Sequence, residues 1–281
     1  MKKLAKLYAK PKLNSPVMLA VWPGIGNVAM IVANYLLDKL EFRDLAEIDA
    51  AHFFDPIGVV ARDSVVDAPH FPDSRFYYWK NKKGNHDLIL FMGDDQPFAK
   101  VYELAGTVLD IGQQFGVSRV YTCAAAPTRI HFTEQPRTWA VATNKKLVAE
   151  LRKLELLQKG TIQIAGLNGL LLGMAKERDT DGVCLLAEVP AQTARMENPV
   201  AALAILKVFT RLLGIEIDTA GLAETAHQTT EQVKQATAIA MGEYLEHFTE
   251  PIWEQGAGEE GDEGGDDGED GGPDDDEQIQ N

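Results

Sequence analysis

Cysteine is scarce in this sequence, with two residues, Cys123 and Cys184, in 281. Each lies inside an apolar run typical of a buried strand. We therefore expect small buried side chains in a reducing compartment, rather than a disulfide or a nucleophile. Neither belongs to a Cys-x-x-Cys pair, and His-Glu-x-x-His is absent as well. The sequence thus predicts neither a bound metal nor a cofactor.

Long apolar runs are also missing. The basic start Met1–Lys6 resembles the first part of a signal peptide, but the apolar stretch that follows, Val17–Trp22, is too short for a signal core or a membrane span. We therefore expect no membrane segment and a cytoplasmic location.

Basic residues are not in excess: 27 Lys and Arg stand against 42 Asp and Glu, for a formal net charge of −15. Between Glu254 and Glu277 lie 13 of the acidic residues, which leaves 29 acidic against 27 basic residues elsewhere. The part of the chain outside 254–277 therefore has no excess of basic residues that would form a basic face. We expect no nucleic-acid binding. The Gly-, Asp- and Glu-rich segment 254–281 cannot bury enough apolar surface to offset its ordering entropy and is predicted to be a disordered tail.

Apolar strand patterns alternate with amphipathic helix patterns along most of the chain. The run 87–92 is almost wholly apolar, as in a central strand covered on both faces, and a helix pattern over 99–115 follows it. This alternation predicts one α/β domain over residues 1–253, with a mostly parallel central sheet flanked by helices. The aromatic segment 74–80 is expected to add an antiparallel edge, and a long C-terminal helix is predicted at about 219–248.

The most informative segment is the end of the first apolar run. Trp22 is followed by Pro23-Gly24-Ile25-Gly26, and a helical pattern begins with Asn27 as its expected N-cap. This order predicts a strand, a tight turn and a helix, with main-chain N–H groups at the carboxyl end of the strand. The glycine spacing matches a loose dinucleotide fingerprint. However, proline precedes it and no Walker-type lysine follows, so a structural turn or a partner-facing loop is the better interpretation.

Three further predicted strands end in loops of similar chemistry, at 93–97, 126–129 and 165–169, where Asn168 between two glycines is expected to make a turn. Parallel strands end at the same edge of a sheet, so we hypothesise that these loops converge on one surface. No nucleophile, base and orienting group can be assembled from them, and we predict no catalytic residue. The predicted interaction surface consists of Trp22, Pro23, Gly24, Gly26, Asn27, Gly93, Asp94, Asp95, Gln96, Pro97, Arg129 and Asn168.

Several charged residues near these loops have two interpretations each. Asp94 and Asp95 are the best acid–base candidates because adjacent carboxylates push each other's pKa apart, but one can instead cap the next helix while the other is solvated. Arg129 can clamp an anion or pair with either aspartate. His131 is a candidate base or an exposed loop histidine. Glu188 is a candidate buried acid, although strand periodicity favours an outward side chain.

Four segments, taken together, resemble the proteasome assembly chaperone 2-like family: 22–28, 93–97, 165–173, and the block that runs from Glu188-Val-Pro to Asn198-Pro199. They occur in the family's order within residues 15 to 225. The resemblance implies an α/β fold related to the purine nucleoside phosphorylase-like architecture and a homo-oligomer, with a trimer as one candidate. In eukaryotic and archaeal relatives it also implies non-catalytic binding to proteasome α subunits.

The C-terminus departs from this family pattern. Relatives that dock on proteasomes commonly end in a hydrophobic residue, a tyrosine and one further residue. This chain ends Ile279-Gln280-Asn281, so the aromatic ring is missing and tail-mediated docking is in doubt.

Two functional hypotheses follow. The first is a non-enzymatic, homo-oligomeric binding or assembly-chaperone-like protein whose partner is another, unidentified protein complex. The second is an enzyme or binder for a nucleoside-like or carboxylate ligand, using Asp94, Asp95 and Arg129. Phosphate sites on such folds usually collect several arginines, and these loops show one, so the first hypothesis is favoured.

Overall fold

The computed structural model describes residues 4–56, 58–157 and 160–249. The predicted tail at 254–281 lies outside them. The chain groups into two compact units, residues 1–234 and 235–281, and in the second unit the structure describes helix residues 235–249.

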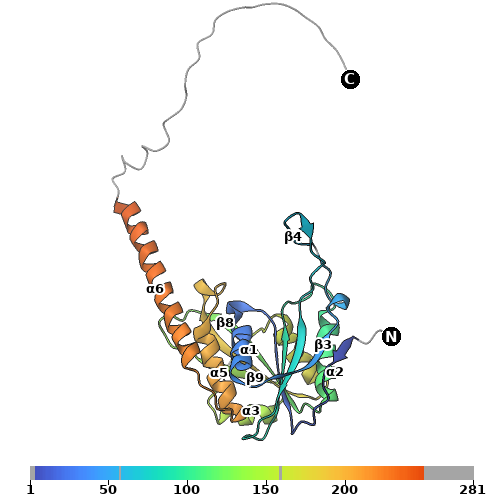
Figure 1. Ribbon diagram of the computed structural model, residues 1–281. Coiled ribbons are helices and arrows are strands. Elements are labelled where there is room, and N and C mark those ends of the chain that lie inside the picture. Colours follow the sequence, from blue (N-terminus) through green and yellow to red (C-terminus); the bar gives the residue numbers. More distant parts are fainter. Residues whose placement is uncertain (1–3, 57, 158–159, 250–281) are drawn as a thin grey trace, which may run out of the picture. The chain divides into compact units, whose positions relative to one another are not determined.

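Eight strands of the first unit form one sheet in the order β1-β3-β6-β7-β2-β8-β10-β9 (Figure 1). The neighbours β7, β2, β8 and β10 are parallel, whereas β1, β3 and β6 at one side and β9 at the other are antiparallel to their neighbours. The strands are β1 (Ala5–Leu7), β2 (Val17–Val21), β3 (Arg43–Ile48), β6 (Ser74–Trp79), β7 (Leu88–Gly93), β8 (Arg119–Thr128), β9 (Thr138–Ala142) and β10 (Asp181–Pro190).

The prediction of a mostly parallel sheet was therefore wrong, because the sheet is mixed. The connection between β6 and β7 spans only residues 80–87, and a parallel crossover needs about a dozen residues or more. The antiparallel edge expected from segment 74–80 is present as β6. The expected likeness to the purine nucleoside phosphorylase architecture is not confirmed.

Helices cover both faces of the sheet. Successive side chains along β2 point to opposite faces. Leu19 and Val21 belong to the core cluster that includes residues of α1 and α5, whereas Met18 and Ala20 belong to the cluster that includes residues of α2 and α4. Figure 1 shows helices on both faces of the sheet. The central strands are therefore buried on both sides, which explains their apolar sequences. The helices are α1 (Val28–Lys39), α2 (Val101–Gln114), α3 (Lys145–Arg152), α4 (Gly166–Glu177), α5 (Pro199–Leu213) and α6 (Ala220–Thr249).

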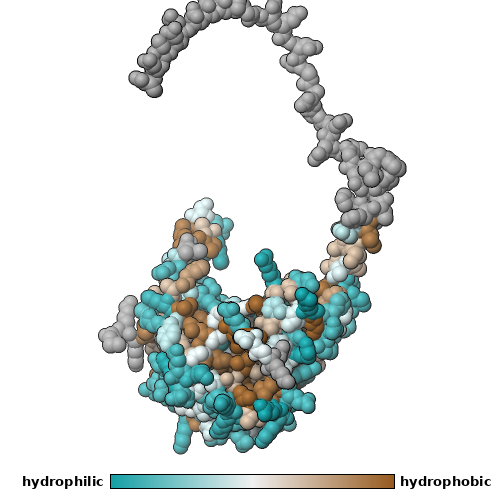
Figure 2. Space-filling view, turned by 180° about the vertical axis from the view of Figure 1, so that it is seen from behind, coloured by the Kyte–Doolittle hydropathy of each residue, from teal (hydrophilic) through white to brown (hydrophobic). Residues whose placement is uncertain are grey.

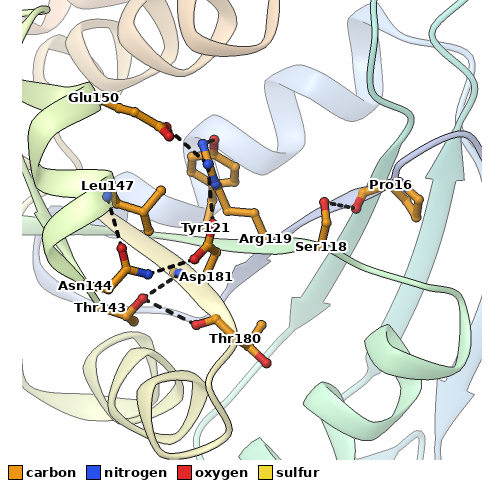
Figure 3. A network of polar contacts seen from close by, with 11 residues as sticks. Pro16, Ser118, Arg119, Tyr121, Thr143, Asn144, Leu147, Glu150, Thr180 and Asp181 are labelled. Carbon is orange, nitrogen blue, oxygen red and sulfur yellow. Dashed lines mark hydrogen bonds and ion pairs between the residues drawn. The ribbon is translucent and has the colours of Figure 1, made fainter.

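A polar network holds α3 at the amino ends of β8 and β10 (Figure 3). The Arg119 guanidinium, at the start of β8, donates to Glu150 of α3 at 3.1 Å and to Asp181 of β10 at 3.5 Å. Asn144 caps α3 by accepting from the Leu147 N–H at 3.0 Å, and its amide donates to Asp181 at 2.7 Å. This network joins α3 to the amino edge of the sheet.

A small hairpin of β4 (Ala61–Arg62) and β5 (Val65–Val66) interrupts the connection from β3 to β6. Since β6 runs antiparallel to β7, its first residue lies beside the last residue of β7. The hairpin therefore arises at the carboxyl edge of the parallel strands, and Figure 1 shows it projecting from the sheet.

Candidate interaction surface at the carboxyl edge

The loop after β2 is held by a side chain from α4. Trp22 is fully buried and packs on Phe91, with the ring centroids 4.9 Å apart. The Trp22 N–H donates to Asn168 Oδ1, and Asn168 Nδ2 donates to the Trp22 carbonyl, both at 3.3 Å. Asn168 lies in α4, so the turn predicted around it was wrong. The reciprocal pair satisfies the main chain of Trp22 beyond the segment where β2 pairs with β8.

Gln96 joins the loop after β7 to the same structure. Its Nε2 donates to the Pro23 carbonyl at 2.7 Å, and its Oε1 accepts from the Leu167 N–H at 2.9 Å. The preceding Gly166 has φ +72°, and a Cβ there would lie 2.8 Å from Gln96 Oε1. The positive φ therefore favours glycine at this position, and a Cβ would displace the end of the Gln96 side chain from its two bonds.

The loop after β10 also meets the loop after β2. The Gly26 N–H donates to the Ala194 carbonyl at 3.0 Å, and the Asn198 N–H donates to the Gly26 carbonyl at 2.8 Å. Asn27 occupies the predicted N-cap position of α1, but its side chain makes no cap hydrogen bond there. Its amide donates to Glu197 at 2.8 Å instead. Three of the predicted loops and the start of α5 thus lie together, joined mainly through main-chain groups.

The predicted surface residues differ in exposure. The buried ones position the loops, and the exposed ones are available to a partner in this conformation. Pro23, Asn27 and Gln96 are intermediate. The buried residues are Trp22, Gly26, Gly93, Pro97 and Asn168, and the exposed residues are Gly24, Asp94, Asp95 and Arg129.

The charged residues of this edge do not form a preassembled anion site. Asp94 Oδ2 accepts from the Asp73 N–H at 3.3 Å, and Asp95 Oδ1 accepts from the N–H of Gln96 at 2.7 Å. No side chain caps the start of α2, so neither aspartate has the capping role considered above. Among the described residues, no ion pair joins Arg129 to either aspartate.

Glu188 lies buried rather than at the surface. Its side chain is 4% exposed and is bound by Arg137, so the outward orientation predicted from strand periodicity was wrong. Hydrogen bonds from the Arg137 side chain lower the pKa of Glu188 and outweigh the opposing effect of burial. His131 is exposed and bonds through Nδ1 to Thr133 Oγ1 at 2.7 Å. No local sequence pattern pointed to Arg137, because its partner lies on a distant strand.

The two cysteine thiols lie in the core. Cys123 and Cys184 are free and buried, and burial raises the pKa of both thiols, that of Cys184 to about 12. Within the described ranges, no group of three or more His, Cys, Asp or Glu side chains is arranged to hold a metal. None of the helices described here has the length and apolar character needed to cross a membrane. The carboxyl edge is formed by loops that hydrogen bonds join to one another.

The mixed sheet, its two helical layers and these loops define an α/β protein with glycine- and proline-rich loops at one sheet edge. The PAC2 family model matches residues 18–237, and the chain belongs to this family. This confirms the resemblance identified from the loop segments. No curated protein gives a significant match to the chain.

Several solved structures are similar to this chain along most of its length. PbaB from Pyrococcus furiosus, described as an archaeal proteasome activator, is 30% identical with a TM-score of 0.71, over 83% of this chain and 98% of that one. A PAC2 family protein from Streptomyces avermitilis is 22% identical with a TM-score of 0.68, over 82% and 99% of the two chains. A proteasome-assembly chaperone homologue from Mycobacterium tuberculosis is 19% identical with a TM-score of 0.67, over 78% and 94%. The last two likenesses concern the fold alone.

Proposed function

We propose that this protein is a non-enzymatic, homo-oligomeric binding protein with an assembly-chaperone-like role in the cytoplasm. Its partner would be another protein complex. The observation that carries this proposal is the set of loops at the carboxyl edge, which Asn168, Gln96 and Gly26 join through hydrogen bonds to the main chain. Among the described residues of these loops, no set of catalytic side chains is assembled. Membership of the PAC2 family and the similarity to an archaeal proteasome activator support a protein partner.

A proteasome-like ring is the first partner to test. The exposed residues of the carboxyl edge, with Asp94 and Asp95 among them, are the proposed contact region. The family comparisons do not favour the small-ligand alternative.

Native mass spectrometry of the purified full chain at micromolar concentration tests the self-association. Discrete oligomers are expected, and only monomer would contradict this part of the proposal. Affinity purification from the native cell, followed by identification of stoichiometric partners, tests the second part. We expect subunits of a larger protein complex, and their loss when Asp94 and Asp95 are both changed to arginine.

A thermal-shift screen with nucleosides, phosphate and nucleotides tests the small-ligand alternative. A ligand at about a hundred times its Kd stabilises a protein by about 2.7 kcal/mol, which is a readily measured shift. The proposal expects no shift. A reproducible shift that disappears in Arg129→Ala would favour the alternative instead.

A further inference from the structure

A groove lies between the projecting hairpin and the loop after β7, and we call it the hairpin groove. It has a volume of about 820 Å³, within the range of sites that hold small ligands or short chain segments. Its apolar walls come from two stretches far apart in sequence. The wall residues used below are Phe54, Val59, Val60, Phe71, Pro97 and Phe98.

The apolar side chains of this region are unusually exposed. Phe98 is fully exposed, directly after the buried Pro97, and Val59 and Val60 are each more than half exposed. Val65 and Val66, on the second hairpin strand, are exposed to a similar degree. Figure 2 shows apolar side chains along the projecting hairpin. Clustered exposed apolar residues in a soluble domain typically mark a site that another molecule covers.

The charged residues of the hairpin groove are mainly acidic. Asp55, Asp67 and Asp95 line it, together with Arg62 and His70. Arg62 is already paired with Asp67 at 3.4 Å. In the described part of the chain, no ion pair engages Asp55 or Asp95. The groove therefore favours an occupant that brings a positive charge to an apolar surface.

A second copy of this chain fits that requirement poorly. The exposed apolar residues of α6 that could enter a groove include Ile239 and Met241. In sequence, Glu243 and Glu246 follow closely after them. Placing these residues against Asp55 and Asp95 would bring like charges together, which opposes binding.

We propose that the hairpin groove binds a short apolar segment of a different protein that carries a lysine or arginine. Apolar side chains of that segment pack on Phe98 and Val60, and its cation meets Asp95 and Asp55. This proposal rests on the proposed function as a protein-binding factor, and it assigns both the surface and the chemistry of the partner segment.

Selection from a phage-displayed library of random linear peptides on the immobilised full-length protein tests the proposal. We expect enriched sequences that combine aliphatic or aromatic residues with Lys or Arg. The Kd of a synthetic, fluorescein-labelled copy of the best sequence is then measured by fluorescence anisotropy. Phe98→Ala should weaken binding at least about tenfold, because truncating a central aromatic contact commonly has an effect of that size. Asp95→Asn should weaken binding and reduce its dependence on salt.

Two residues outside the groove provide matched controls. Glu155 is an exposed acidic residue and Ile25 is an exposed apolar residue of the loop after β2, and neither lines the groove. Glu155→Gln and Ile25→Ala should each leave the peptide Kd unchanged. Circular dichroism of all four variants should match that of the wild type, which would show that they fold.

The proposal is overturned if no peptide is enriched, or if acidic peptides are enriched. It is equally overturned if enriched peptides bind Phe98→Ala and Asp95→Asn as tightly as the wild type. Each of these results leaves the oligomer and the cellular partner measurable in their own assays. Failure of the groove proposal can therefore be distinguished from failure of the proposed function.

Discussion

The Glu188 side chain is 4% exposed, whereas the Arg137 side chain that binds it is 82% exposed. Arg137 Nη2 donates to Glu188 Oε1 at 2.9 Å, and Nε donates to Oε2 at 3.1 Å. The Arg137 main-chain N–H adds a third bond to Oε2 at 2.9 Å. The arginine thus covers a buried carboxylate while its own side chain faces solvent. This pair fixes the loop between β8 and β9 to the end of β10.

Glu188→Gln should lower the free energy of unfolding by about 1–3 kcal/mol near neutral pH, because hydrogen bonds to a charged group contribute about that much. The folded pKa of Glu188 lies below its unfolded value of about 4.3, so its contribution is present above that value. The contribution is lost as the pH falls through the folded pKa. Urea unfolding from neutral to acid pH should show wild type and variant converging in this acid range.

The exposed Glu155 provides the control for this series. Glu155→Gln should track the wild type at every pH. If Glu188→Gln and Glu155→Gln had equal effects, Arg137 would contribute no specific stabilisation to the fold.

The thiols of Cys123 and Cys184 should not react with a thiol reagent in the native protein. Burial raises the pKa of Cys184 to about 12 and that of Cys123 well above its ordinary value. Because the thiolate is the reactive form, neither should react with Ellman's reagent at pH 8 until the chain unfolds. Denaturant should release both thiols together. Rapid reaction of one thiol in the native state would show a local opening of the central strands.

The meeting of the loops after β2 and β7 was predictable, because these strands are parallel neighbours and parallel strands end at the same edge of a sheet. The strand-end argument does not explain the other two predicted loops. Residues 126–128 belong to β8, and the segment 165–169 follows no strand because residues 161–165 form none and α4 begins at Gly166. The antiparallel direction of β6 was expected from segment 74–80, and the connection 80–87 is long enough for a hairpin but too short for a crossover. The antiparallel directions of β1, β3 and β9 were not predicted.

Side-chain partners far apart in sequence account for the other errors. The outward orientation predicted for Glu188 assumed that side chains alternate between a buried face and a solvated face of the strand. However, β10 is buried on both faces. Asn27 and Asn168 have sequences typical of a cap and a turn, whereas their amides bond to Glu197 and to the main chain of Trp22. Such partners are set by tertiary packing, which local patterns do not contain.

Gly93→Ala should destabilise the protein by about 1–3 kcal/mol, the usual cost of overpacking a core. A Cβ at Gly93 would lie 2.5 Å from Nε1 of Trp22, whose indole is buried against Phe91. The indole would have to move, so the native tryptophan fluorescence should change as well. Gly173 is the matched control, because a Cβ there meets nothing within 4 Å. Gly173→Ala, in α4, should keep stability or raise it by up to about 1 kcal/mol.

Asn168→Asp tests whether the reciprocal pair with Trp22 holds the loop after β2. A carboxylate at this position still accepts from the Trp22 N–H but cannot donate to the Trp22 carbonyl, which would repel it. Because the site is buried, the pKa of the new acid should be raised in the folded state. The protonated acid can donate, so the variant should approach wild-type stability at acid pH. It should lose about 3 kcal/mol as the pH rises through the raised folded pKa.

Asn198→Asp is the control for the chemistry of this substitution. Asn198 Oδ1 accepts from the Ala201 N–H at 2.9 Å at the start of α5, and aspartate is an equally good N-cap. This variant should therefore stay within about 0.5 kcal/mol of the wild type at neutral pH. Thermal unfolding of the three proteins across pH separates the cases. If Asn168→Asp matched Asn198→Asp at pH 7, the bond donated by Asn168 to the Trp22 carbonyl would be dispensable for holding the loop after β2.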